Sequence, residues 1–427
     1  MTPQRALICT YGTRGDVEPS LALAKALQAE GIEVLVATSV RFQDWIEGMG
    51  IACYPMSDRS LAIIETPDGK ILLEGGVSLF KRIATIKRLK KQAHPINDKL
   101  MRQTWEAARD FKPDFIVYHP KLFTAPHVAE RLGIPAFLAI LQPIIVPTSA
   151  FPPAGLPRIP LPGCNRLSYQ LIHLSFSIFR KAISRFRQEI LGLPPIHKAR
   201  EVLFPAAMGT IPVLHAFSHH VLPRPDDWPD HAIMTGYWRL DKGTGYTPPP
   251  ELTAFIKAGP PPVFIGFGSM TSADPKELGQ LVSGALRKAG KRGVVARGWA
   301  DLAVDTADDI MVIEPTPYDW LFPQMAAVVH HGGAGTTAEG FHAGVPCAIC
   351  PFFGDQPGWA RISVDLGVGA TPVPRHKLTE DTLAAAIDEA VSTPALRSNA
   401  KVLAGKLAAE NGTENALRYI FQYLENR

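Results

Sequence analysis

Cysteine is scarce in this sequence, which holds five cysteines among its 427 residues. The number is odd and the positions are scattered, so the pattern excludes the disulfide framework of a small secreted domain. Cys347 and Cys350 are separated by two residues, but they lie in an apolar run typical of a buried strand and have no second pair. We interpret them as core residues rather than as a redox or metal site. A carboxylate cluster with metal-ligand spacing is also lacking, so no metal site is predicted.

An excess of charge of one sign is absent too. The formal net charge of +4 is small for this length, so nothing in the overall balance requires nucleic acid as a partner. The N-terminus lacks the charged and apolar regions of a signal peptide. The most apolar stretch, residues 134–147, is interrupted by prolines and is too short to span a bilayer. We expect a cytoplasmic protein with no transmembrane helix.

What the sequence does contain is a regular alternation of short apolar runs with segments of helical periodicity. Residues 6–11, 19–31 and 32–39 read as strand, helix and strand, and the pattern recurs after residue 114 and again after residue 261. We predict an α/β protein of two Rossmann-like, doubly wound parallel-sheet domains that face each other across a cleft. The predicted parts are an N-terminal domain 1–222, a proline-rich linker 223–260, a C-terminal domain 261–405, and a helix 406–427 that packs back toward the N-terminal domain.

The stretch HHGGAGTTAEG, residues 330–340, joins an apolar run to a predicted helix. Its glycines let the backbone approach a ligand closely, and the unpaired N–H groups of the helix start attract an anion such as a diphosphate. A histidine beside this turn can donate to a phosphate oxygen. The alternative is that the glycines only permit a tight turn and that His330 or His331 fills a pocket. The spacing is not that of a P-loop.

Three further turns follow predicted strands. In TYGTRGDVEPS, residues 10–20, Asp16 could be a base or a helix N-cap, and Pro19 just inside the helix favours the N-cap. GFGSM, residues 266–270, could offer Ser269 to the same phosphates. PFFGDQPGWA, residues 351–360, could hold sugar hydroxyls and place Trp359 against a sugar face, or could be an ordinary polar loop.

With these motifs in place, the chain resembles the family 1 nucleotide-sugar glycosyltransferases, especially their sterol glucosyltransferase and glycopeptide-antibiotic branch. The resemblance is carried by residues 262–370 and by TYGTRGDVEP near the N-terminus. It implies the GT-B fold, with the acceptor in the N-terminal domain and the nucleotide sugar in the C-terminal one. The activity implied is inverting, metal-independent transfer of a hexose from UDP-glucose to a hydroxyl of a hydrophobic acceptor such as a sterol, with no cofactor besides the UDP-sugar.

Three other functions stay open at this point. The acceptor could be a polyphenol or an antibiotic aglycone instead of a sterol. The chain could be an enzyme of the same fold with other chemistry, such as an epimerase. It could also be a silent module that binds a nucleotide sugar or a lipid.

The family pattern places its donor-binding residues on this sequence at Ser269, Trp299, His331, Gly333, Gly335, Thr336, Glu339, Asp355 and Gln356. His331, Ser269 and the glycines would contact the diphosphate, and Glu339 would accept hydrogen bonds from the ribose. Trp299 would line the base pocket, while Asp355 and Gln356 would hold the transferred sugar.

On the acceptor side, the branch that this chain resembles has an aspartate where plant relatives have a histidine base, and here that residue is Asp16. We expect Asp16 to take the proton of the acceptor hydroxyl. The same loop contains Gly12, Thr13, Arg14 and Gly15. His119 lies near the place of the aspartate that orients the plant histidine, and it is a second catalytic candidate.

A basic segment suggests a further partner. Residues 80–91 carry six cations and no acid, namely Lys81, Arg82, Lys87, Arg88, Lys90 and Lys91. Apolar residues recur between them at helical spacing, and residues 177–187 repeat the theme. Such a helix can lie on an anionic membrane, or it can be a solvated basic face over core residues. We expect peripheral membrane contact in addition to the nucleotide sugar and the acceptor, and no nucleic-acid partner.

Overall fold

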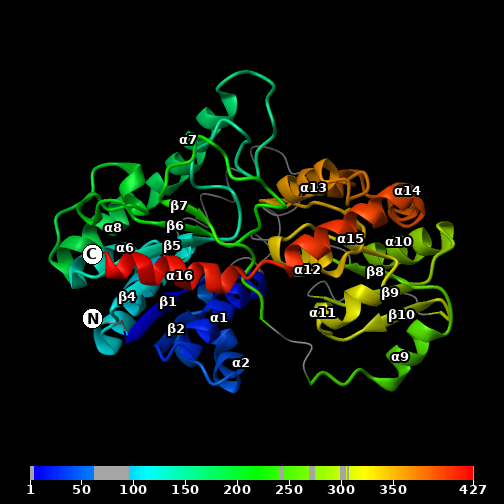
Figure 1. Ribbon diagram of the computed structural model, residues 1–427, viewed down its shortest axis with the longest axis horizontal. Helices are drawn as coiled ribbons and strands as arrows, with labels where there is room; N and C mark the ends of the chain where they lie inside the picture. The colour runs from blue at the N-terminus through cyan, green and yellow to red at the C-terminus, as the bar shows by residue number, and fades with distance from the viewer. Residues whose placement is uncertain are drawn as a thin grey trace.

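The computed structural model of the chain describes residues 4–61, 96–240, 245–268, 275–298, 304 and 307–426. The predictions for Ser269, Trp299 and the six cations of residues 81–91 therefore lie outside the described residues. Two parallel sheets, each covered by helices on both faces, lie side by side (Figure 1). The two-domain α/β fold predicted from the sequence is confirmed.

The first sheet has seven parallel strands in the order β3-β2-β1-β4-β5-β6-β7. Their bounds are β1 Arg5–Cys9, β2 Glu33–Ser39, β3 Ala52–Met56, β4 Phe115–Tyr118, β5 Ala136–Ile140, β6 Val213–His215 and β7 Ala232–Met234. Strand β1 lies between β2 and β4, so that Cys9 is level with Ala37 and Tyr118. These strands are almost continuously apolar because helices bury both of their faces.

The helices of this domain are α1 Arg14–Ala29, α2 Gln43–Gly48, α6 Ala125–Leu132, α7 Cys164–Phe176 and α8 Arg180–Phe186, and residues 96–111 are helical as well. Alternate residues of β1 face opposite layers of helices. Ile8 belongs to the same apolar cluster as Val17 and Leu21 of α1. Leu7 belongs to the cluster that contains Val128 of α6. The period of two along the strand thus gives the domain two cores.

The second sheet has five parallel strands in the order β10-β9-β8-β11-β12. Their bounds are β8 Val263–Gly266, β9 Gly293–Ala296, β10 Ile310–Ile313, β11 Ala327–His330 and β12 Cys347–Ile349. The helices are α9 Pro250–Lys257, α10 Pro275–Lys288, α11 Tyr318–Leu321, α12 Ala334–Ala343, α13 Gln356–Asp365, α14 Glu380–Ser392 and α15 Pro394–Ala408. His330 pairs with Gly266, so β8 and β11 end side by side and their following turns are neighbours.

The connection between the sheets is shorter than the predicted linker 223–260. Strand β7 lies inside that range and pairs with β6 of the first sheet. Helix α9 also lies inside it and packs Leu252 with Phe264 of the second sheet. Some of the prolines that suggested a linker belong to the start of α9, which has Pro250 in its first turn. Proline is favourable there because the N–H that it lacks would have no partner within the helix. Among the described residues, 235–240 and 245–249 lie between β7 and α9.

The last helix, α16 (Gly412–Glu425), returns the chain to the first domain (Figure 1). Ala416 and Ile420 join the apolar cluster of α1, and the ring of Tyr423 meets that of Phe137 edge-on at 5.2 Å. Helix α15 stays with the second domain and packs on α12. No described helix has the length and hydropathy needed to cross a membrane.

Candidate active site

Two helix starts meet where the two domains face each other. Helix α1 begins at Arg14 after β1, and helix α12 begins at Ala334 after β11. A Cβ on Gly335 would lie 3.7 Å from the Cα of Gly15. The small residues at both turns therefore let the two N-termini approach closely, and the polar groups around them form the candidate active site.

Asp16 is buried in the first turn of α1. Its Oδ2 accepts hydrogen bonds from the backbone N–H of Thr13 at 2.8 Å and from Lys121 Nζ at 2.9 Å. Burial raises the pKa of Asp16, but the charge of Lys121 and the nearby His119 outweigh it and lower the pKa below its ordinary value. Asp16 is not the N-cap, since Thr13 holds that position and Asp16 is the third residue of the helix. The site thus presents an ionised carboxylate at neutral pH.

His119 lies directly after β4, and the structure brings it to Asp16. Its Nε2 is 3.7 Å from Asp16 Oδ1, and both side chains are almost fully buried. Its Nδ1 accepts the backbone N–H of Lys121 at 3.4 Å, which leaves the proton on Nε2, toward the carboxylate. Burial lowers the pKa of His119 to about 4, helped by Lys121 and opposed by Asp16. His119 is therefore neutral and can orient Asp16.

Lys121 was not predicted from the sequence. It lies two residues after His119, in a short turn of 3-10 helix (Pro120–Leu122), and its side chain is half exposed. The available signal was its spacing from His119, at a strand end next to β1. A Cβ on Gly12 would overlap the Asp16 carboxylate and would crowd Lys121, so the pair requires a glycine there. Arg14 points elsewhere, with its guanidinium on the Trp45 ring at 4.6 Å.

The donor-side turn is shaped around the ring of His331. A Cβ on Gly333 would lie 2.5 Å from His331 Nε2, and a Cβ on Gly268 would lie 2.8 Å from His331 Cε1. Burial lowers the pKa of His331 to about 4, so the ring is neutral. Its Nδ1 is buried and has no hydrogen-bond partner in the described part of the chain. His330 plays a different part, because its Nδ1 accepts the N–H of Gly332 at 3.0 Å inside the turn.

The start of α12 is free of side-chain caps. Gly333 is the N-cap residue and has no side chain to accept a hydrogen bond from the helix. Thr337 Oγ1 donates to the carbonyl of Gly333 at 2.9 Å and so does not cover the N–H groups. Thr336 is partly exposed beside Gly335, and no protein group among the described residues bonds its hydroxyl. The first turn of α12 therefore offers backbone and hydroxyl donors to an anion.

Glu339 lies one turn further along α12 and is largely buried. Arg239, from the connection between the sheets, donates from Nη2 to Glu339 Oε2 at 2.9 Å. The carboxylate is thus held in place beside the helix start. A ribose hydroxyl that binds Glu339 would share it with Arg239, which the sequence analysis did not foresee.

The loop before α13 contains Asp355, Gln356 and Trp359. Asp355 accepts the indole N–H of Trp359 on Oδ2 at 2.8 Å. Burial raises the pKa of Asp355, and the negative charge of Asp16 raises it further, so the two carboxylates are close enough to interact. Trp359 is fully buried. The prediction that it lies against a sugar face is therefore wrong. Its indole N–H instead holds the Asp355 carboxylate in place.

Gln356 holds the loop that carries Asp355. Its Oε1 accepts the backbone N–H groups of Phe352 at 2.7 Å and Phe353 at 3.1 Å. A loop of the first domain also packs here, since a Cβ on Gly155 would lie 2.6 Å from the carbonyl oxygen of Gly354. Both domains therefore contribute to the shape of this part of the site.

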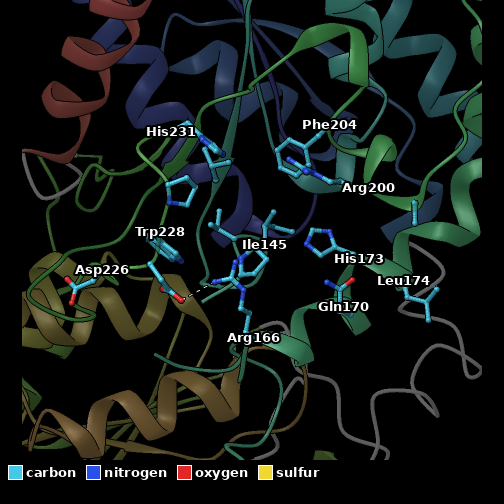
Figure 2. Close-up of a pocket in the computed structure, with 16 residues that line it drawn as sticks. Ile145, Arg166, Gln170, His173, Leu174, Arg200, Phe204, Asp226, Trp228 and His231 are labelled. Atoms are coloured by element: carbon cyan, nitrogen blue, oxygen red, sulfur yellow. Dashed lines mark hydrogen bonds and ion pairs between the residues drawn. The ribbon is translucent and has the colours of Figure 1, made fainter. Parts of the chain in front are cut away.

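A cavity of about 610 Å³ lies on the first-domain side. It is lined by residues 145–147 after β5, by α7, and by residues 226–231 before β7 (Figure 2). Ile145, Phe204 and Trp228 give it apolar walls, and an ion pair joins Arg166 to Asp227 at 3.4 Å. The loop after β5 connects it to the site, because its Ala154 backbone lies against the position that a Cβ on Gly358 would take.

Cys347 and Cys350 are buried at β12, where burial raises the pKa of each thiol to about 12. Their interpretation as core residues is confirmed. Within the described residues, no three His, Cys, Asp or Glu side chains are grouped to hold a metal ion.

Two family models match the chain, one on each domain. Residues 6–149 match the glycosyltransferase family 28 N-terminal domain, and residues 296–419 match the erythromycin biosynthesis protein CIII-like C-terminal domain. Two proteins of Arabidopsis thaliana are similar over almost the whole chain. Sterol 3-beta-glucosyltransferase UGT80B1 is 35% identical, with 98% of this chain and 68% of that protein covered. Sterol 3-beta-glucosyltransferase UGT80A2 is 34% identical, with 99% and 66% covered.

The chain belongs to the sterol 3-beta-glucosyltransferase family of glycosyltransferases. A Neurospora crassa member is 34% identical over 99% of this chain, but the chain spans only 27% of that protein. Among solved structures, the calicheamicin glycosyltransferase CalG4 matches with a TM-score of 0.69 at 18% identity, over 100% of this chain and 99% of that one. The glycotransferase of kitacinnamycin matches with a TM-score of 0.70 at 19% identity, over 98% and 99%. These structures have the two-domain GT-B fold, so the fold predicted from the sequence is confirmed. The predicted family is confirmed by the Arabidopsis relatives.

Proposed function

We propose that the chain transfers a hexose from a nucleoside diphosphate sugar to a hydroxyl of a hydrophobic acceptor, with inversion at the anomeric carbon. The observation that carries the proposal is the meeting of an uncapped helix start, at Gly333 and Ala334, with the ionised Asp16 of the opposite domain. The first suits a leaving diphosphate and the second suits a base. Asp355 lies near enough to both domains to hold the sugar between them.

Proton transfer is the task of the first domain in this proposal. The acceptor hydroxyl gives its proton to Asp16 as its oxygen bonds to the anomeric carbon, and the bond from that carbon to the diphosphate breaks on the opposite face. Lys121 keeps Asp16 ionised before the reaction, and neutral His119 lies beside the other carboxylate oxygen, 3.7 Å away. A positioned base of this kind contributes about 10²- to 10⁴-fold to the rate.

Charge stabilisation is the task of the second domain. The diphosphate would lie at the start of α12, within reach of the backbone N–H groups and the Thr336 hydroxyl and beside the His331 ring, whose Nε2 lies toward Gly333. Dipoles fixed in this way stabilise a leaving anion without reorganising during the reaction. We therefore propose that transfer needs neither a metal nor a cofactor, which activity retained in EDTA would support.

The sugar and the acceptor are assigned more finely from the relatives' names. Both Arabidopsis relatives are named sterol 3-beta-glucosyltransferases, which supports glucose as the sugar and a sterol or similar polycyclic alcohol as the acceptor; we propose UDP-glucose as the donor. Three strand spacings separate β1, beside Asp16, from β6, beside the cavity, and these amount to about 14 Å. An elongated, rigid alcohol can cover that distance with its hydroxyl at Asp16 and its body in the cavity.

Location and membrane contact stay predictions. The cytoplasmic location rests on the sequence pattern alone. The six cations of residues 81–91 support peripheral contact with an anionic membrane through their charge.

The experiment is to measure UDP release from UDP-glucose with sterols, other polycyclic alcohols and flavonoids, for the wild type and for Asp16→Asn. The amide can still accept the Thr13 N–H but cannot take a proton, so we expect acceptor-dependent release that falls at least about 100-fold in the variant. Binding of UDP should not change. Asp44→Asn, at an exposed position on α2, is the matched control.

Two outcomes would contradict the proposal. UDP release that is equally fast without acceptor would indicate a hydrolase or an epimerase-like enzyme. Tight UDP binding with no release for any acceptor would indicate a binding module.

A further inference from the structure

Helix α7 exposes an apolar stripe to solvent. Leu167, Leu171, Leu174 and Ile178 follow each other at spacings of four, three and four residues, so they share one side of the helix and of the turn that follows it. Their exposed fractions run from 55% to 68%. Ile159 and Leu161, in the loop before the helix, are also exposed. Together these six residues form what we call the α7 apolar surface.

The helix does not need this stripe for its own packing. Its other side already meets the core, where Tyr169 is fully buried and Ile172 and Phe176 pack against the main cluster of the first domain. A surface helix of a globular protein normally keeps one side polar. A helix with an apolar side toward the core and a second one toward solvent indicates an interaction surface.

Positive charge surrounds the α7 apolar surface. No aspartate or glutamate occurs in residues 131–188, whereas Arg158, Arg166, Arg180, Lys181 and Arg185 do. Arg166 and Arg185 pair with Asp227 and Asp98, but no described carboxylate pairs with Arg158, Arg180 or Lys181. Arg180, Lys181 and Arg185 also line a hollow of about 400 Å³ on α8, directly after the apolar stripe.

The surface continues into the cavity assigned to the acceptor. Leu174 belongs to the stripe and also lines the cavity, next to His173 and Gln170 of the same helix (Figure 2). In Figure 1 the loop before α7 projects from the top of the molecule, away from both sheets. The α7 apolar surface and the cavity therefore adjoin at Leu174.

We propose that the α7 apolar surface inserts into the interface of an anionic membrane, with Arg158, Arg180 and Lys181 at the lipid headgroups, and that the acceptor enters the cavity from the bilayer. This inference rests on the proposed function for the identity of the acceptor. An apolar helix side with a cationic rim is the pattern of an interfacial membrane helix. A second copy of the chain fits less well. A two-fold contact through this surface would bring the unpaired cations of one copy near the same cations of the other, and like charges repel.

The test compares wild type with the triple variant Leu167→Ser, Leu171→Ser and Ile178→Ser, which leaves Leu174 at the cavity. Sedimentation with vesicles of phosphatidylcholine and phosphatidylserine should show binding at least about tenfold weaker for the variant. Val364→Ser together with Val402→Ser, at exposed apolar positions of the second domain, should bind like the wild type. All these proteins keep the cations of residues 81–91, so a loss is assigned to α7.

A second variant and an activity readout complete the test. Arg180→Gln with Lys181→Gln should reduce the preference for anionic vesicles over phosphatidylcholine alone, although the cations of residues 81–91 remain. Glucosyl transfer to sterol in the vesicles should fall in the triple variant, while transfer to the same sterol in detergent micelles should not. If no acceptor is ever glycosylated, the proposed function fails, and the vesicle binding still decides this inference.

Two results would overturn the inference. The first is vesicle binding by the triple variant that equals wild-type binding. The second is a wild-type dimer in light scattering that the triple variant abolishes, which would make the surface an interface between copies.

Discussion

The two helix starts that face each other at the site are built in opposite ways. At α1 the carboxylate of Asp16 folds back onto the N–H of the N-cap residue Thr13, so a side chain of the helix itself occupies one donor at its start. At α12 the N-cap residue is Gly333 and no side chain takes that role. A helix start with an acidic side chain on its donors is a poorer anion site than one without such a side chain. The difference supports the proposal that α12, rather than α1, binds the diphosphate.

The histidines beside the two helices also differ in whether groups of the protein itself are their partners. His119 faces an ionised carboxylate that itself faces a lysine, so charges inside the protein balance one another. His331 faces no charged side chain in the described residues, and one of its nitrogens lacks a partner. This contrast supports the proposal that the first domain moves the proton and that the second binds the charged ligand.

A side chain added at Gly333, the N-cap residue of α12, should have the largest effect on transfer. In Gly333→Ala the new Cβ would lie 2.5 Å from His331 Nε2, so the ring or the turn must move away from the phosphate position. We expect transfer to fall at least about 100-fold, the usual cost of losing a preorganised anion donor. Initial rates and calorimetric binding of UDP measure it. Gly340→Ala is the control, because it lies in the same helix and its Cβ would meet nothing within 4 Å. Equal UDP affinity in both variants would contradict the assignment of α12.

Removing the charge of Glu339 should have the next largest effect. If the carboxylate accepts from the ribose, Glu339→Gln weakens a charged hydrogen bond and raises the KM for UDP-glucose about tenfold, with kcat little changed. Wild type should bind UDP more tightly than its 2′,3′-dideoxy analogue, and the variant should not distinguish the two. Arg239→Gln separates loss of the ion pair from loss of the ribose contact. A variant that still prefers the ribonucleotide would show that Glu339 has only a structural role.

Much of this arrangement was predictable, because it depends on spacing along the chain. Alternation of apolar runs gave the two sheets, and the glycine-rich turn at residues 330–340 gave the donor-side helix start. Contacts between segments distant in sequence were not predictable. Lys121 is 105 positions from Asp16, and nothing local indicates that β4 lies beside β1.

The errors have physical causes as well. Trp359 was expected at a sugar because exposed aromatic rings suit sugar faces, but its place on the inner side of α13 buries it. The linker was overestimated because proline occurs at helix starts as well as in loops, and Pro250 begins α9. Composition could not distinguish these cases, since burial depends on which elements pack together.

A smaller effect is expected from removing the positive charge of Lys121, which faces Asp16. Lys121 lowers the pKa of Asp16, so the base stays ionised to lower pH than an isolated aspartate would. Lys121→Met should raise that pKa and move the acidic limb of kcat/KM up by about one pH unit. Lys121→Arg should leave the limb in place. The pH profile measures the shift, and an unchanged limb in Lys121→Met would mean that the limb reports another group.

The smallest effect should come from Thr13→Ala at the self-satisfied helix start. The variant loses the Oγ1 donor that lies 3.2 Å from Asp16 Oδ2 but keeps the backbone N–H at 2.8 Å. We expect the free energy of unfolding to fall by about 1 kcal/mol, as for other N-cap threonines, with UDP affinity unchanged. Urea denaturation and calorimetry measure the two quantities. A large loss of UDP affinity would mean that α1 also contacts the nucleotide, and the contrast between the two helix starts would then not hold.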